Sequence, residues 1–205
     1  TQSTTVNGLG DGSWTVLVYL DGDNNLEYPA LLDLKEMQEG VGDNVNIVVL
    51  LDRSVNDEAP YSGDPVDGVG SFSGARLLHV TKDGIEVLGT GDAATSNPAT
   101  LAQVGTVAFQ RFPADHYAVS LWDHGGAWHG FAVDESSGDE AMMTIDEVQS
   151  GLQQIIDNTG IGKLDYVIWD ACLMGELEIA DAMSPVADYM IALSLIHISE
   201  PTRPY

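Results

Sequence analysis

A single cysteine, Cys172, lies in the segment Val-Ile-Trp-Asp-Ala-Cys-Leu-Met-Gly at residues 167–175. The apolar residues before it predict a buried strand, so we expect the thiol just beyond the carboxyl end of that strand. A second polar cluster, Asp123-His124-Gly125-Gly126, follows another predicted strand. If the two strands are neighbours, the Cys172 thiol and the His124 imidazole face each other. Such a pair suits nucleophilic catalysis, because the thiolate attacks while the histidine lowers its pKa or carries its proton.

The glycines after His124 fit the same chemistry. Gly125 lets the backbone approach a substrate closely and offers an N–H group to a developing oxyanion. The backbone N–H of Cys172 is a second candidate donor. We expect a last helix marked by Leu173, Leu177 and Ala180, which would place Cys172 near a helix N-terminus, where the helix dipole favours an anion.

Each of these residues also has a structural interpretation. A lone cysteine at a strand end is usually a small buried apolar residue, and a lone histidine is usually a hydrogen-bonded structural residue. Their combination with a Gly-Gly turn favours chemistry. The order is also informative, because His124 precedes Cys172 by 48 residues, close to the separation of about 50 in caspases.

Hydrophobic patterns predict the elements that position these residues. Helical spacing is expected around Ala30 to Val41, after Asn97-Pro98, and behind a capping box at Thr144–Glu147. The segment 75–89 predicts a hairpin about Asp83-Gly84, and an acidic loop over 52–74 is expected to rim the site. Alternating strands and helices indicate an α/β fold with a mostly parallel sheet. The predicted buried strands are 14–20, 45–51, 116–122 and 165–170.

Other motifs are weaker. Asp21-x-Asp23-x-Asn25 begins like a calcium-binding loop, but Leu26 replaces the glycine that such a loop needs for its turn. We therefore interpret residues 21–25 as a turn at the end of a strand. His79 and His116 are interpreted as structural.

The composition limits the partners of this protein. The chain has 32 acidic and 7 basic residues and a formal net charge of -25, which disfavours nucleic acid and anionic membranes and attracts cationic ligands such as basic peptides. No apolar run reaches the roughly 20 residues that a membrane helix needs, so no membrane insertion is expected. No signal peptide is visible.

The two ends are expected to lie outside the domain. Residues 1–13 are rich in Thr, Gly and Ser and are predicted to be loose. Residues 193–205 resemble the in-frame translation of a transposon-derived sequencing adapter, so we interpret them as a non-native tail. The domain would then span 14–192, and the outer edge of the 165–170 strand is expected to lack a partner.

Four segments carry a resemblance to a known family: WTVLVYLDGDNNLE, NPATLAQ, ADHYAVSLWDHGGAW and DACLMGELEIA. Through them the chain resembles the clostripain-like cysteine peptidases. The resemblance implies a caspase-like three-layer α/β sandwich with a mostly parallel sheet and a β-hairpin insertion. It also implies an endopeptidase with His124 and Cys172 as the catalytic dyad. Asp170 matches an aspartate associated with cleavage after Arg or Lys, and a carboxylate at the base of a pocket can pair with such cations.

The resemblance also bears on cofactors, partners and location. The dyad needs no cofactor, although calcium is possible by family analogy with ligands that the sequence does not identify. The implied partners are protein or peptide substrates with basic residues, and the implied location is secreted or extracellular. Two alternatives remain: a non-catalytic peptide-binding module on the same fold, and a peptidase of different specificity in which Asp170 is structural.

Overall fold

The computed structural model describes residues 12–54, 64–91, 94–134 and 141–193. The ends predicted to be loose or foreign lie almost entirely outside these ranges. The helices are α1 (Glu27–Gly40), α2 (Pro98–Arg111), the 3-10 helix η1 (Ala127–His129), α3 (Ile145–Thr159) and α4 (Leu177–Met183). The strands are β1 (Trp14–Gly22), β2 (Val45–Arg53), β3 (Ala75–Thr81), β4 (Gly84–Gly91), β5 (His116–Trp122), β6 (Phe131–Asp134), β7 (Ala141–Met143), β8 (Leu164–Asp170) and β9 (Ala187–Ala192).

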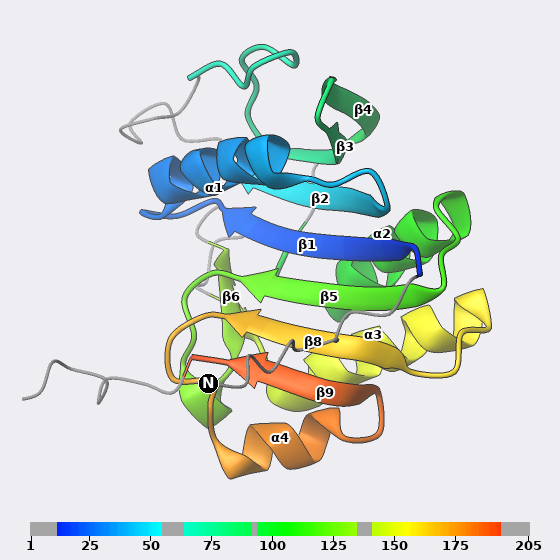
Figure 1. Cartoon of the computed structure of the whole chain (residues 1–205). Coiled ribbons are helices and arrows are strands. Elements are labelled where there is room, and N and C mark those ends of the chain that lie inside the picture. The colour runs from blue at the N-terminus through cyan, green and yellow to red at the C-terminus, as the bar shows by residue number, and fades with distance from the viewer. Residues whose placement is uncertain (1–11, 55–63, 92–93, 135–140, 194–205) are drawn as a thin grey trace, which may run out of the picture.

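A seven-stranded sheet with the order β4-β3-β2-β1-β5-β8-β9 forms the centre of the fold (Figure 1). The five strands from β2 to β9 are parallel, and β3 and β4 add an antiparallel hairpin. The prediction of a mostly parallel α/β sheet with a hairpin insertion is therefore confirmed. The hairpin turn is shifted by one residue, because Thr81 pairs with Gly84 and the turn residues are Lys82 and Asp83.

The two faces of the sheet carry separate apolar cores. On one face α1 covers β1 and β2 through Ala30 and Leu34. On the other, α2, α3 and α4 cover the central strands, and β6 and β7 form a small second sheet against the same core. The Asn97 side chain caps α2, and the predicted capping box of Thr144 and Glu147 starts α3. These layers form the three-layer sandwich.

Three expectations need correction. The outer edge of β8 has a partner, because residues 187–192 form β9 and pair with it in parallel. The last helix begins at Leu177 rather than Leu173. The loop after the second strand begins beyond Arg53, since Asp52 and Arg53 belong to β2 and are buried; its residues 55–63 lie outside the described ranges.

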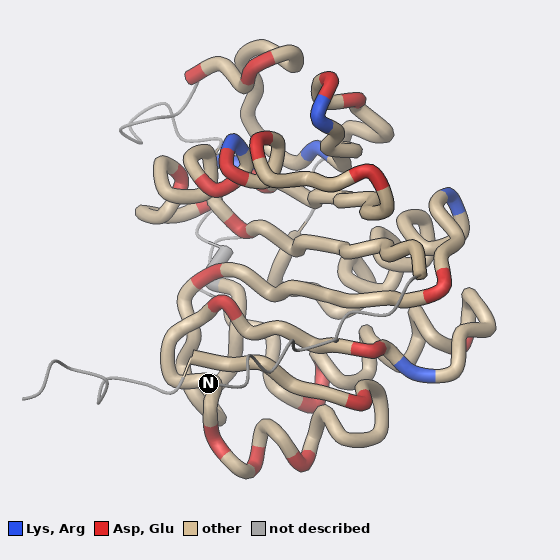
Figure 2. Tube along the Cα trace, viewed as in Figure 1, with Lys and Arg blue, Asp and Glu red and all other residues tan. Residues whose placement is uncertain are grey.

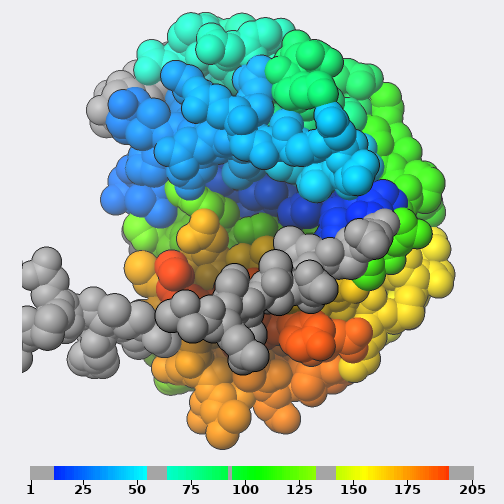
Figure 3. All heavy atoms as spheres, in the orientation of Figure 1, coloured from blue at the N-terminus to red at the C-terminus, as the bar shows by residue number. Residues whose placement is uncertain are grey.

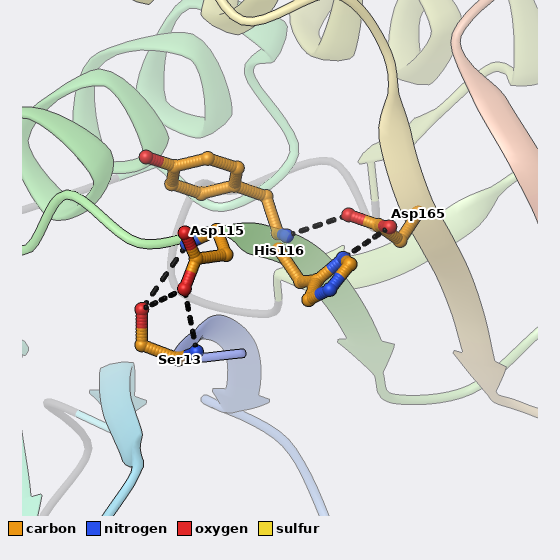
Figure 4. A network of polar contacts seen from close by, with 5 residues as sticks. Ser13, Asp115, His116 and Asp165 are labelled. Carbon is orange, nitrogen blue, oxygen red and sulfur yellow. Dashed lines mark hydrogen bonds and ion pairs between the residues drawn. The ribbon is translucent and has the colours of Figure 1, made fainter. Parts of the chain in front are cut away.

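A polar network closes the edge of the sheet opposite the carboxyl ends of the parallel strands (Figure 4). The His116 ring lies 2.8 Å from Asp165 Oδ1 and stacks on Trp14. The Ser13 N–H and hydroxyl both donate to Asp115. Ser13 contacts His116 only through the backbone, since its carbonyl oxygen accepts from the His116 N–H at 3.1 Å, and its hydroxyl bonds to Asp115. This group therefore ties the strand ends together and lacks the side-chain contacts of a nucleophilic triad.

Asp and Glu residues are spread along the trace of the fold, whereas Lys and Arg residues are sparse (Figure 2). Within the described ranges, no helix is long and apolar enough to cross a membrane.

Candidate active site

The strand register brings the predicted residues to one edge of the sheet. Trp122 at the end of β5 pairs with Asp170 at the end of β8. His124 and Cys172 each follow two residues later, so they leave neighbouring parallel strands at the same level. Adjacent strands lie about 4.8 Å apart. The two strands are thus neighbours, which is the condition that the sequence analysis set for the pairing of His124 with Cys172, and their loops start side by side.

Cys172 lies on a tight turn held by buried neighbours. Ala171 and Met174 are 2% and 0% exposed, while Cys172 itself is exposed. Leu173 has a φ of 67°, a left-handed conformation that costs a non-glycine residue about 1–2 kcal/mol. The turn therefore presents the thiol to solvent from a fixed base. Because α4 starts at Leu177, Cys172 lies outside its first turn. The expectation that the dipole of this helix favours an anion at Cys172 is therefore wrong.

Gly125 brings the histidine loop against this turn. A β-carbon at Gly125 would lie 2.1 Å from the carbonyl oxygen of Cys172 and 3.0 Å from the Met174 side chain. Real β-carbons essentially never approach that closely, so the contact requires glycine. Gly125 also forms an isolated antiparallel bridge with Phe131, which is fully buried. The two candidate oxyanion donors, Gly125 and Cys172, are thus in contact through their backbones.

The His124 ring has a partner that the sequence reasoning missed. Its Nε2 lies 2.7 Å from Asn25 Oδ1 in the loop after β1. Among the described residues, no hydrogen bond joins the ring to Cys172. One residue earlier on each loop, Asn24 Nδ2 donates to Asp123 Oδ1 at 2.8 Å. The signal for these contacts was the pair of asparagines at the end of a predicted strand, which we interpreted only as turn residues.

Behind this pair lies a row of buried aspartates. Asp21, Asp52 and Asp123 occupy equivalent positions on β1, on β2 and just after β5, and all are nearly inaccessible to solvent. Burial, with the nearby Asp123 and Asp52 carboxylates, raises the pKa of Asp21 well above its usual value, although hydrogen bonds from Thr95 and the Asp23 N–H oppose the shift. A buried Arg53–Glu27 pair, 2.7 Å apart, lies in the same region.

Asp170 projects to the face of the sheet that carries α1. It lines a pocket of about 300 Å³ with Asp33 and Glu36 of α1 and Trp122 of β5. Burial and, secondarily, the Asp33 carboxylate raise the pKa of Asp170. Asp33 also accepts a 2.7 Å hydrogen bond from Trp122 Nε1. In the space-filling view the surface is hollowed below α1, over β1 and β5 (Figure 3).

The sequence reasoning did not include Asp33, because a carboxylate on an amphipathic helix looks like an ordinary solvent-facing residue. Only the packing of α1 over β1 and β2 brings it beside Asp170.

No calcium ligands can be assigned. In the described ranges, no three His, Cys, Asp or Glu side chains are arranged to hold a metal ion.

The comparisons with known proteins agree with this geometry. The chain is 28% identical to clostripain from Hathewaya histolytica over 88% of its own length and 38% of that protein. A secreted C11 cysteine protease from Bacteroides thetaiotaomicron, solved with an irreversible peptide inhibitor, matches with a TM-score of 0.67 and 30% identity over 87% of this chain and 48% of that one. An inactive zymogen C11 protease from Parabacteroides distasonis matches with a TM-score of 0.63 and 25% identity over 90% and 49%.

The chain thus spans about half or less of the length of these relatives. The match to the clostripain family itself covers residues 18–203, most of the sequence. This match agrees with the strand order and with the loops that carry His124 and Cys172. The chain belongs to the clostripain family of peptidases.

Proposed function

We propose that this protein is a cysteine endopeptidase that cleaves peptide bonds after Arg or Lys, with His124 and Cys172 as its catalytic pair. The observation that carries the proposal is the register of β5 and β8, which starts the two loops side by side at the carboxyl edge of a parallel sheet. Ligand sites in open α/β sheets lie at this edge. Family membership supports a thiol mechanism, and the exposed position of Cys172 supports its role as the nucleophile.

In this mechanism the Cys172 thiolate attacks the carbonyl carbon of the scissile bond. The backbone N–H groups of Gly125 and Cys172 hold the oxygen that becomes negative. His124 gives its proton to the leaving amine, and a thioester to Cys172 forms. Water then hydrolyses the thioester and passes a proton to His124, which restores the free enzyme. No cofactor takes part in these steps.

Asp170 supplies the preference for a basic side chain. It lines an acidic pocket beside the Cys172 turn, and a carboxylate there can pair with a guanidinium or ammonium group. The strong negative charge of the chain attracts such substrates over a longer range. We also propose a secreted location, supported by the relative from Bacteroides thetaiotaomicron that is described as secreted.

The test is peptide hydrolysis combined with covalent labelling. Cys172→Ala should abolish cleavage of a short peptide with Arg before the scissile bond, and His124→Ala should lower the rate by roughly 10²–10⁴-fold. His129→Ala, at an exposed histidine in η1, is the matched control and should retain activity. A lysine-containing peptide electrophile should label Cys172. Binding of peptides without hydrolysis or labelling would favour the non-catalytic module instead.

A further inference from the structure

We propose that Asn25 is a positioning residue for His124: its amide oxygen accepts the Nε2 proton, which leaves Nδ1 to exchange a proton with Cys172. The role in proton exchange rests on the proposed function. The ring geometry does not, because it follows from the 2.7 Å separation of His124 Nε2 and Asn25 Oδ1.

With the Asn25 amide oxygen facing the ring, the hydrogen bond selects one tautomer of His124. An amide oxygen can only accept a hydrogen bond, so the nitrogen that faces it must carry a hydrogen. In a neutral imidazole only one nitrogen is protonated, and the other carries the lone pair. With Nε2–H directed at Asn25, Nδ1 is the basic nitrogen. It can take the thiol proton, S–H and Nδ1 becoming S⁻ and Nδ1–H⁺, and return it later.

An exposed hydrogen bond alone would hold the ring weakly, because water competes for both partners. Here a buried contact fixes the distance between the two loops. Asn24 Nδ2 donates to Asp123 Oδ1 at 2.8 Å, and both residues are about 5% exposed. Consecutive residues of the β1 loop thus contact consecutive residues of the β5 loop, Asn24 with Asp123 and Asn25 with His124.

The β1 loop is itself held in place. The Leu26 N–H donates to Asn24 Oδ1 at 2.8 Å, and the Asp23 N–H donates to Asp21 Oδ1 at 3.1 Å. The helix α1 starts immediately afterwards at Glu27. Since β1 lies directly beside β5, these contacts place the Asn25 amide at the carboxyl edge beside His124 with little freedom.

Asn25 is neutral, which distinguishes it from a carboxylate in the same position. A carboxylate would stabilise the imidazolium form of His124 by its negative charge. The amide orients the ring and selects the tautomer without adding a charge. This difference makes Asn25→Asp an informative conservative variant, since it keeps an acceptor oxygen but changes the charge.

The decisive experiment is nitrogen NMR of the 205-residue chain with ¹⁵N-labelled histidine, His124 being assigned from the signals lost in His124→Gln. We expect neutral His124 to be protonated on Nε2, and Asn25→Ala to give a mixture of tautomers. Asn25→Asp should retain the Nε2–H form. Asn44→Ala, at an exposed asparagine before β2, is the control and should leave the tautomer unchanged.

Kinetics supply the second readout. Asn25→Ala should lower kcat about 10- to 100-fold with little change in KM, because the ring is misplaced and not the substrate, and Asn25→Asp should recover part of the loss. Protonation of neutral His124 on Nδ1 in the wild type, or an unchanged tautomer in Asn25→Ala, would overturn the proposal. The NMR result decides this point even if the chain hydrolyses no peptide, an outcome that would count against the proposed function alone.

Discussion

A β-carbon on Gly125 would lie 2.1 Å from the carbonyl oxygen of Cys172. The loop that carries the candidate base therefore touches the turn that carries the candidate nucleophile, and the contact is between backbones. Side-chain rearrangement cannot relieve an overlap with a carbonyl oxygen. The loops must move apart if anything larger than glycine occupies this position.

Gly125→Ala should consequently damage both stability and activity. We expect a loss of about 1–3 kcal/mol in the free energy of unfolding, typical of overpacking, and a loss of peptide hydrolysis of about 100-fold, because a displacement of about 1 Å costs that much. Gly162→Ala is the matched control, since a β-carbon there meets nothing within 4 Å. Thermal unfolding and initial rates check both effects, and a fully active Gly125→Ala variant would contradict the close contact.

The specificity prediction concerns Asp170. Asp170→Asn should lose much more activity on peptides with Arg or Lys before the cleaved bond than on the same peptides with norleucine, because only the cations pair with the carboxylate. Because Asp170 is exposed to solvent, the loss should lie at or below the lower end of the roughly 2–5 kcal/mol found for buried charge pairs when one partner is truncated. Asp181→Asn, exposed on α4, is the control. Equal losses on both peptide types would make Asp170 a structural residue.

The sequence predicted the framework of this site well, for a physical reason. The strands that end at His124 and Cys172 are continuous apolar runs, and such runs become buried parallel strands with few alternatives. Residues 116–122 form β5 with the predicted limits. The predicted start of α2 was equally clear, because Asn97 and Pro98 satisfy the requirements of a helix N-terminus locally.

The sequence predicted less where long-range contacts decide the structure. The short strand β9 was missed because Tyr189 and Ile191 are half exposed and the segment has no distinctive pattern; its pairing with β8 defines it. The spacing of Leu173 from Leu177 predicted a helical residue. Leu173 instead has a positive φ, because the buried Ala171 and Met174 fix the turn around it. The positions of Asn25 beside His124 and of Asp33 beside Asp170 depend on packing between elements, which local sequence patterns do not encode.

The pH dependence of specificity follows from the raised pKa of Asp170. A basic side chain binds the ionised carboxylate, so the preference for Arg over norleucine should fall as the pH drops towards this pKa. Because burial and Asp33 raise the pKa above the ordinary value of about 3.9, the decline should begin at a higher pH than for a solvated aspartate. The measurement is the ratio of kcat/KM for the two peptides, in which pH effects common to both peptides cancel.

Asp33→Asn provides the discriminating variant for this pH effect. It removes the like charge beside Asp170 and keeps an acceptor for Trp122 Nε1. The pKa of Asp170 should then fall, and the decline in the ratio should move to lower pH. A ratio that does not depend on pH in either protein would show that Asp170 does not meet the substrate cation.

The last prediction concerns the buried aspartate row and the stability of the site. The folded state raises the pKa of Asp21, chiefly by burial and then through Asp123 and Asp52. The folded protein therefore binds a proton at Asp21 more tightly than the unfolded chain does. The resulting stabilisation is complete below the unfolded pKa of about 3.9 and is lost as the pH rises through the folded pKa.

Other carboxyl groups titrate in the opposite sense, so the effect must be measured as a difference. Asp43, Asp115 and Glu147 have lowered pKa values and make the fold more stable as the pH rises. Asp21→Asn removes the Asp21 titration and its charge beside Asp123 and Asp52, whereas Asp43, Asp115 and Glu147 titrate in both proteins. The free energy of unfolding of the wild type minus that of the variant should fall as the pH rises above about 4, by at most about 1.4 kcal/mol per pH unit, and level off above the folded pKa.

Thr95→Val sharpens this test. The Thr95 hydroxyl donates to Asp21 Oδ2 at 2.7 Å and lowers the pKa of Asp21. Its removal should raise that pKa further, so the decline should extend to higher pH when Asp21→Asn is compared in the Thr95→Val background. Thr90→Val, at an exposed position on β4, is the matched control and should leave the curve unchanged. If the difference in the free energy of unfolding does not change between pH 4 and 8 in either background, folding does not raise the pKa of Asp21. The row of aspartates at the base of the site would then not destabilise the fold.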